Sequence, residues 1–348
     1  RDFVEVSIAA AKAGLACVYL NTGFAAPQLG EVLLREGVRA IVVDSNLAAV
    51  VEASGFDGHV VIADDASGTG TGTHRSIDDV RGLGSSRPLL PSKPIAPVLL
   101  TSGTTGTPKG VMLTHDNLDA MTASFVEWFS LDATDHSLLV LPLFHANGIV
   151  LGTLSPLRAG GQVSITGRFS RDRFFDDVQR HRPTFFSAVP AIYALLSALP
   201  DEVRPDTSSL RFAVCGAAPM PAELSERVEK RFGLTIVEGY GLSETTCASA
   251  INPLTGQRKP GTVGLPLPGQ QVAIITEDGA QAAPGEVGEV VIAGPVVMAG
   301  YLNRPEATAQ TIIDGWLRTG DLGVFDEDGY LRIVDRVKDM IIRGGENV

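Results

Sequence analysis

The sequence predicts an α/β fold with two lobes built on mainly parallel sheets, followed by a small antiparallel β-barrel. As far as about residue 250, apolar runs of strand length alternate with helical patterns, which is typical of βαβ units. Beyond Pro260 the pattern changes to short strands separated by turns, which is typical of hairpins. A chain of 348 residues also exceeds what one small hydrophobic core supports, so we expect at least two lobes.

Three α/β cycles open the chain. Each pairs a helical pattern with an apolar strand, and the pairs cover residues 3–20, 26–44 and 46–63. Residues 64–95 are rich in Asp, Gly, Ser, Thr and Pro, which indicates a solvated surface loop without a chemical role.

A loop of glycines and hydroxyl residues then follows an apolar strand. Its glycines let backbone N–H groups surround an anion, its hydroxyls add donors, and Lys109 supplies a positive charge. It differs from the common P-loop, because Pro108 and Gly110 stand where that motif has glycine and a hydroxyl residue. A flexible linker is the alternative, but linkers rarely lie between two apolar segments. The predicted polyphosphate site comprises Thr101, Ser102, Gly103, Thr104, Thr105, Gly106 and Lys109.

A helix over 116–129 with an apolar stripe comes next, and a buried strand over 138–144 runs directly into His145. Asn147 and Gly148 follow in a turn of small residues. A lone histidine after such a strand is more often structural than functional, so both interpretations stay open on the residues alone.

Further α/β cycles cover residues 171–199, where a strand over 184–190 carries Val189 and precedes a helix with Ile192. For Phe185, Phe186 and Ile192 core packing is the simplest interpretation. The strand Arg211–Cys215 ends in Gly216, Ala217 and Ala218, small residues that let a flat ligand approach the backbone closely.

The segment from Glu238 to Glu244 has a tyrosine between two glycines, Gly239 and Gly241. The ring of Tyr240 can therefore lie against a purine without obstruction by neighbouring side chains. Glu244 with nearby hydroxyls suits magnesium, which prefers oxygen ligands. An ordinary turn with an exposed glutamate is the alternative.

Asp321 stands in the segment Gly315–Leu322, directly after a turn. A carboxylate in such a position can accept hydrogen bonds from both hydroxyls of a ribose. A simple turn-forming role is the alternative. The strongly charged segment 335–347 follows the last predicted strands.

Four of these segments resemble, in the same order, specific motifs of the adenylate-forming superfamily. That superfamily contains acyl-CoA synthetases, the adenylation domains of peptide synthetases and beetle luciferases. The likeness covers nearly the whole chain, and bacterial fatty-acid–CoA ligases resemble it most. The strongest matches are Thr101–Gly110, Ile236–Thr246 and Gly315–Leu322, and Pro142–Gly148 is similar to the family's second motif.

The resemblance implies roles for the candidate residues. Lys109 and the loop hydroxyls bind the β- and γ-phosphates, Ser243 contacts the α-phosphate, and Glu244 binds Mg²⁺; these are the expected catalytic residues. The expected nucleotide contacts, with Tyr240 stacked on adenine and Asp321 and Arg336 on ribose, are Gly216, Ala217, Ala218, Glu238, Gly239, Tyr240, Gly241, Asp321 and Arg336. The acid pocket, with His145 as a gate toward the thiol tunnel, comprises His145, Asn147, Gly148, Val189 and Ile192.

The implied reaction uses ATP, Mg²⁺ and CoA to convert a carboxylic acid first into an acyl-AMP and then into a thioester. A fatty acid is favoured, because the pocket segments are apolar and no Asp or Arg is placed to hold an amino acid. An aryl-acid CoA ligase, an adenylation module that loads a carrier protein, and a binding-only protein are the alternatives.

The expected organisation is a first lobe over 1–170, a second over 171–265, a β-barrel over 266–334 and a hinge over 335–348. Both ends look truncated, and the family's C-terminal domain of about a hundred residues is essentially absent. Since that domain supplies a lysine for adenylation, we expect this chain to bind ATP but to form acyl-AMP slowly.

Composition limits the partners. The formal charge of −12 argues against nonspecific binding to nucleic acids or anionic membranes. No apolar run approaches the length of a membrane span. Three scattered cysteines, Cys17, Cys215 and Cys247, fit a reduced cytoplasm better than a disulfide framework. The oligomeric state stays open, a homodimer included.

Overall fold

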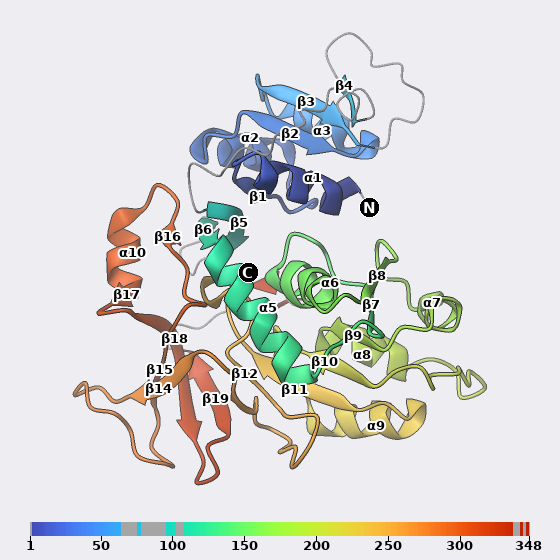
Figure 1. The fold of residues 1–348 in the computed structure, drawn as a ribbon, viewed down its shortest axis with the longest axis vertical. Coiled ribbons are helices and arrows are strands. Elements are labelled where there is room, and N and C mark those ends of the chain that lie inside the picture. The colour runs from blue at the N-terminus through green and yellow to red at the C-terminus, as the bar shows by residue number, and fades with distance from the viewer. Residues whose placement is uncertain are drawn as a thin grey trace. The chain divides into compact units, whose positions relative to one another are not determined.

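The computed structural model describes residues 2–63, 75–77, 95–101, 108–336, 342–343 and 346–347 (Figure 1). The chain divides into two compact units, Arg1–Leu100 and Thr101–Val348. All predicted site residues belong to the second unit. Most of the predicted surface loop, and residues 102–107 of the predicted phosphate loop, lie outside the described residues.

The first unit confirms the three predicted α/β cycles. Its strands β2, β3 and β4 form a parallel sheet, and β1 pairs in parallel with β5 through Cys17 and Pro97. A small apolar core contains Leu29 and Ile41. The elements are α1 (Asp2–Lys12), β1 (Cys17–Tyr19), α2 (Ala26–Arg35), β2 (Ala40–Val43), α3 (Ala48–Ala53), β3 (His59–Ile62), β4 (Arg75–Ser76) and β5 (Ile95–Thr101).

The second unit begins with β6 (Lys109–Thr114) and α5 (His115–Phe129), which directly follow the phosphate-loop segment. The helix starts where it does because of a capping box: the N–H of Asn117 donates to the Thr114 hydroxyl, while the N–H of Thr114 donates to the Asn117 side chain. The predicted apolar stripe is core, since Met121, Phe125 and Phe129 are buried.

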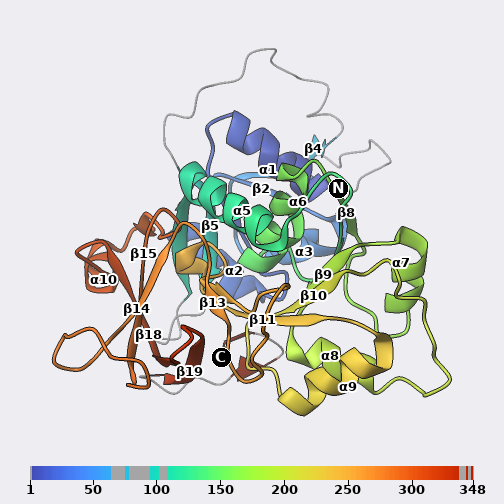
Figure 2. The same ribbon diagram turned by 60° about the horizontal axis from the view of Figure 1, so that its bottom comes forward.

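A seven-stranded sheet forms the centre of this unit, with the order β13-β12-β11-β10-β9-β7-β8 (Figure 2). Five strands are parallel, as predicted, and β12 and β13 are antiparallel additions. The expected lobe boundary at residue 170 falls between β8 and β9 of this one sheet. The strands are β7 (His136–Leu139), β8 (Gln162–Ile165), β9 (Phe185–Ala188), β10 (Phe212–Cys215), β11 (Ile236–Tyr240), β12 (Ala250–Ile251) and β13 (Leu265–Pro266).

Helices α6 (Ser155–Arg158), α7 (Phe174–His181), α8 (Pro190–Ser197) and α9 (Ala222–Phe232) connect these strands. Stacked and edge-on phenylalanines fill the core; for example, the rings of Phe185 and Phe212 lie 5.1 Å apart. In the described part of the chain no helix is both long and apolar enough to cross a bilayer.

The turn after β7 leads into a π-helix, Asn147–Leu154, where the sequence predicts only a small-residue turn. The hydroxyl of Thr153 donates to the carbonyl of Gly148, and the hydroxyl of Ser155 donates to that of Val150, each five residues back. The carbonyl of Val150 also accepts the backbone N–H of Ser155, so the Ser155 hydroxyl adds a second hydrogen bond at the end of this buried helix.

The expected antiparallel β-structure is an open, curled sheet of β14, β15, β18 and β17, with β19 paired to β18. The two-residue strand β16 instead pairs with β6. The elements are β14 (Gln271–Ile275), β15 (Gly288–Ala293), β16 (Gly300–Tyr301), α10 (Pro305–Thr311), β17 (Ile312–Ile313), β18 (Trp316–Phe325), β19 (Leu331–Arg336), β20 (Ile342–Arg343) and β21 (Glu346–Asn347).

Candidate active site

The carboxyl ends of the parallel strands bring several predicted residues to one edge of the seven-stranded sheet. Ala188, Cys215 and Glu238 are backbone neighbours across β9, β10 and β11. Val189 and Gly216 come directly after the first two of these positions. In open α/β sheets, ligands bind at this edge. The predicted acid and adenine segments therefore share one side of the sheet.

The Gly216–Ala218 segment turns sharply as it leaves β10. Ala217 has φ of 67°, a left-handed conformation that is unfavourable for a residue with a Cβ. A Cβ at Gly216 would meet only the carbonyl oxygen of Gly239, at 3.5 Å. The predicted backbone approach to a flat ligand thus coincides with a strained turn, which is typical of functional sites.

Glu238 is half-buried beside this turn. Burial raises the pKa of its carboxyl group to about 7, so near neutral pH part of the protein carries it protonated. The nearby Cys215 thiol also has a raised pKa because of burial, and burial raises the pKa of Cys247 to about 12. Neither thiol is therefore a ready nucleophile.

The glycines around Tyr240 are required by packing. A Cβ at Gly241 would lie 2.2 Å from the carbonyl oxygen of Cys247, and one at Gly239 would lie 2.9 Å from the side chain of Ile251. The backbone N–H of Ser249 donates to the carbonyl of Tyr240 at 2.7 Å. The turn is thus packed closely against the strand that follows it, and it fixes the direction of the tyrosine.

Tyr240 and Asp321, which are 81 residues apart in the chain, meet directly. The phenolic hydroxyl of Tyr240 donates to Oδ2 of Asp321 at 2.6 Å. Asp321 is only 1% exposed. The residues predicted for adenine and for ribose therefore lie side by side, although one belongs to the parallel sheet and the other to the antiparallel sheet.

The position of Asp321 on β18 is fixed by its own strand and by β15. Its N–H donates to the Thr319 hydroxyl at 3.1 Å, and the N–H of Gly320 donates to Glu289 at 3.0 Å. Arg336 is the backbone partner of Asp321 on β19. The second predicted ribose residue is thus placed next to the first along the sheet.

Glu244 lies in a short 3₁₀ helix, Ser243–Thr245, that follows the Gly-Tyr-Gly turn. The next residue, Thr246, is fully buried and has φ of 67°, a rare conformation for a β-branched residue. The Glu244 side chain accepts a hydrogen bond at 2.9 Å from the hydroxyl of Tyr301, which the sequence analysis did not identify.

Lys109 begins β6, and its Nζ lies 4.7 Å from the centroid of the Tyr301 ring. Burial and the neighbouring Glu244 carboxylate raise the pKa of the Tyr301 hydroxyl, so this group stays a donor. Lys109 and Glu244 thus contact one tyrosine. The only sequence signal was an isolated Gly-Tyr pair, in a chain with five tyrosines.

The donor set fits magnesium bound together with a nucleotide. Within the residues that the structure describes, no three His, Cys, Asp or Glu side chains gather in a way that could hold a metal ion. Magnesium commonly binds through one or two carboxylates and the phosphates of its substrate. Glu244 is the protein carboxylate that fits this pattern here.

The residues predicted to form the acid pocket lie at the start of the π-helix and of α8. The rings of Phe144 and His145 are 4.5 Å apart, and Gly148 is buried against the carbonyl of Pro142. The buried Oδ1 of Asn147 has no hydrogen-bond partner among the described residues. Ile192 is 8% exposed and belongs to the core, which agrees with its simplest interpretation.

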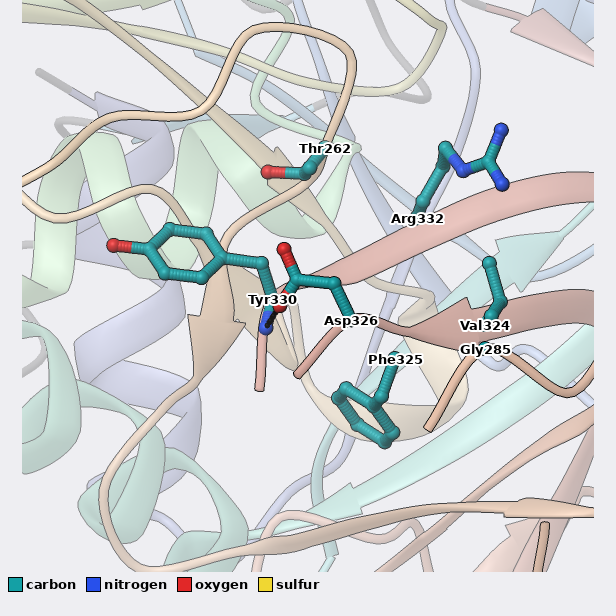
Figure 3. Close-up of a pocket in the computed structure, with 7 residues that line it drawn as sticks. All are labelled: Thr262, Gly285, Val324, Phe325, Asp326, Tyr330 and Arg332. Atoms are coloured by element: carbon teal, nitrogen blue, oxygen red, sulfur yellow. Dashed lines mark hydrogen bonds between the residues drawn. The ribbon is translucent and has the colours of Figure 1, made fainter. Parts of the chain in front are cut away.

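A separate pocket of about 220 Å³ lies on the antiparallel sheet (Figure 3). Its walls come from β18, β19, the turn between them and two loops, and include Asp326, Tyr330 and Arg332. None of its lining residues is a predicted site residue. Lys259 anchors this corner, because its Nζ donates to Asp326 at 2.6 Å and to Asp328 at 2.5 Å.

Comparison with known proteins decides the family. The family described as AMP-binding enzyme matches residues 1–302. This chain belongs to that family. Among solved structures, ATP-bound MatB from Rhodopseudomonas palustris matches this member with a TM-score of 0.86 and 30% identity, over 100% of this chain and 69% of MatB. The fold predicted from the motifs, that of the large N-terminal domain of adenylate-forming enzymes, is thus confirmed.

Relatives of this AMP-binding protein act on different acids. The sulfoacetate–CoA ligase of Cupriavidus necator is 43% identical over 76% of this chain and 52% of its own length. The long-chain-fatty-acid–CoA ligase of Bacillus subtilis is 40% identical over 74% of this chain and 47% of its own length. A feruloyl-CoA synthase from an Amycolatopsis species is 35% identical over 99% and 68%. The chain thus spans about half the length of the first two relatives.

Proposed function

We propose that this chain is part of an ATP-dependent acid–thiol ligase. In the first step a carboxylate oxygen attacks the α-phosphorus of ATP, which forms acyl-AMP and releases pyrophosphate. In the second step the sulfur of CoA attacks the acyl carbon, AMP leaves, and the thiol proton passes to solvent. Relatives that are CoA ligases support this proposal.

The hydrogen bond from Tyr240 to Asp321 is the observation that carries the proposal. Adenine and ribose are joined by a single bond, so residues that bind them must be neighbours. The adjacency of two distant motif residues is what one adenosine requires. The carbonyls and N–H groups at the end of β10 lie beside the same strand, β11.

The chain's own residues then supply charge and orientation. Lys109 offsets the negative charge that develops on the β- and γ-phosphates as pyrophosphate leaves, and Ser243 holds the α-phosphate. Mg²⁺ bound at Glu244 would neutralise phosphate oxygens. We assign His145 to the boundary between the acid and the thiol, as the family resemblance implies, and no covalent enzyme intermediate is needed.

The acid we propose is a fatty or similarly apolar acid. The pocket segments around Gly148, Val189 and Gly216 are small or apolar, and the fatty-acid ligase of Bacillus subtilis is among the relatives. Relatives named for sulfoacetate and ferulate define the competing classes. An aryl acid is therefore the second candidate.

Two measurements test the function. Calorimetric titration of ATP should show binding that falls by roughly tenfold or more in Tyr240→Ala and in Asp321→Ala, with a combined effect smaller than the sum, because the two residues share a hydrogen bond. If the two losses were fully additive, the shared adenosine site would be wrong.

The second measurement is pyrophosphate release with aliphatic, aryl and sulfonated acids, with CoA or a phosphopantetheine carrier protein as acceptor. Thioester formation from aliphatic acids and CoA is the expected result. A response to aryl or sulfonated acids with none to any aliphatic acid would end the fatty-acid proposal, and thioester formed on the carrier alone would identify a carrier-loading module.

A further inference from the structure

Tyr301 is held rigidly between two residues of the proposed nucleotide site. It is 6% exposed and pairs with Val111 across β16 and β6. Its N–H donates to the Thr308 hydroxyl at 2.9 Å. A tyrosine fixed from both sides in this way can fix the groups that touch it.

The ring and the hydroxyl of Tyr301 contact different partners. Lys109 Nζ lies 4.7 Å from the ring centroid, within the range of a cation–π attraction. The hydroxyl donates to Oε1 of Glu244 at 2.9 Å, a hydrogen bond strengthened by the charge of its acceptor. The same side chain therefore restrains an ammonium group and a carboxylate group of opposite charge.

We infer that Tyr301 is a positioning residue for adenylation: its ring seats the Lys109 ammonium, and its hydroxyl orients the Glu244 carboxylate. This inference rests on the proposed function. The contact with the ring matters because Lys109 follows a glycine-rich loop and has a long side chain. Free rotation of this side chain would lower the fraction of time that its ammonium group spends near the phosphates. The orientation of Glu244 matters because Mg²⁺ demands a nearly ideal ligand geometry.

Two variants separate the two contacts. Tyr301→Phe keeps the ring and removes the hydroxyl, whereas Tyr301→Leu removes both. We expect Tyr301→Phe to raise the Mg²⁺ concentration needed for half-maximal ATP binding by about three- to tenfold, while ATP affinity in EDTA stays within about twofold. Tyr301→Leu should also weaken ATP binding in EDTA by about two- to fivefold.

Tyr330 provides a matched control outside the proposed site. Lys259 Nζ lies 4.5 Å from its ring centroid, and its hydroxyl donates to the carbonyl of Gln257. Tyr330→Phe and Tyr330→Leu therefore break the same kinds of contact in another place. Neither variant should change the Mg²⁺ requirement or ATP affinity.

A third measurement needs no nucleotide. An amine-acylating reagent, with mass spectrometry of the peptide that contains Lys109, reports how tightly its ammonium is held. Tyr301→Leu should raise the labelling rate of Lys109 by about twofold or more, and Tyr301→Phe should leave it unchanged.

The outcomes separate the two proposals. If Tyr301→Phe leaves the Mg²⁺ requirement unchanged, if Tyr330→Phe shifts it equally, or if Tyr301→Leu leaves Lys109 labelling unchanged, the positioning role is wrong. If the unmodified protein binds no ATP but Tyr301→Leu still raises the labelling rate of Lys109, the proposed function is wrong. The contact by which Tyr301 restrains Lys109 would then still be supported.

Discussion

Ala217 has a backbone conformation in the candidate site that does not suit its side chain, with φ of 67°. A left-handed conformation costs a residue with a Cβ roughly 1–2 kcal/mol, whereas glycine adopts it freely. Because glycine also loses more conformational freedom on folding, we expect Ala217→Gly to raise the free energy of unfolding by about 0.5–1 kcal/mol.

The neighbouring Ala218 provides the control for this prediction. It has no positive φ, so Ala218→Gly should lower the free energy of unfolding by about 0.5–1 kcal/mol. Urea unfolding of the two variants at one pH measures both effects. Equal destabilisation by the two substitutions would show that the left-handed turn stores no strain.

Glu238 makes stability depend on pH. Its pKa of about 7 in the folded protein lies above the ordinary value of 4.5, so the folded state binds the proton more tightly than the unfolded state. The stabilisation is therefore complete below about pH 4.5 and is lost as the pH rises through about 7. Because Glu238 is only half-buried, we expect a loss of about 1–2 kcal/mol, less than the full shift implies.

Glu238→Gln removes the titrating group while it keeps a similar shape. The urea midpoint of this variant should vary less between pH 5 and pH 8 than that of the unmodified protein. The variant should be the more stable of the two at pH 8. An unchanged pH dependence would show that Glu238 titrates normally.

At the scale of an element, the turn after β11 depends on Gly241. A Cβ there would lie 2.2 Å from the carbonyl oxygen of Cys247 and 2.4 Å from Cα of Ala248, so the backbone would have to move. We expect Gly241→Ala to cost about 3 kcal/mol or more in unfolding free energy. Gly216→Ala, with its only near contact at 3.5 Å, should cost about 1 kcal/mol or less, and thermal unfolding compares the two.

Elements that carry their own signal could be predicted from the sequence. An apolar stripe predicted the helix α5, and apolar runs that end in small residues predicted the central strands. The π-helix Asn147–Leu154 could not be predicted, since it is apolar on all sides and its bonds leave no distinct period. The strand β8 follows two glycines and has only four residues, so the sequence carries no clear signal for it.

In the candidate site, too, local features could be predicted from the sequence, whereas contacts between distant residues could not. The glycines beside Tyr240 predicted a tight turn, because the need for small residues is local. That Tyr240 meets Asp321 followed only from the family resemblance, since no local rule joins residues 81 positions apart. Tyr301 was missed because its partner Glu244 is 57 positions away and its strand has two residues. The roles assigned to the site residues stay predictions.

At the scale of the whole molecule, the chain covers 69% of the ATP-bound MatB structure and 47–52% of two close relatives. The nucleotide residues proposed here all lie in the second compact unit. We therefore expect the residues of this unit to suffice for ATP binding, which calorimetric titration measures.

The Tyr240–Asp321 hydrogen bond joins β11 of the parallel sheet to β18 of the curled sheet, in addition to the backbone hydrogen bond between Leu331 and Gly264. An adenosine bound to both sheets would link them, because its base would lie against the parallel sheet and its sugar against the curled sheet. Local opening of the curled sheet would then free the nucleotide while the parallel sheet stays folded. Saturating ATP should accordingly slow amide hydrogen exchange in both β11 and β18. The nucleotide should dissociate at the rate at which the curled sheet opens.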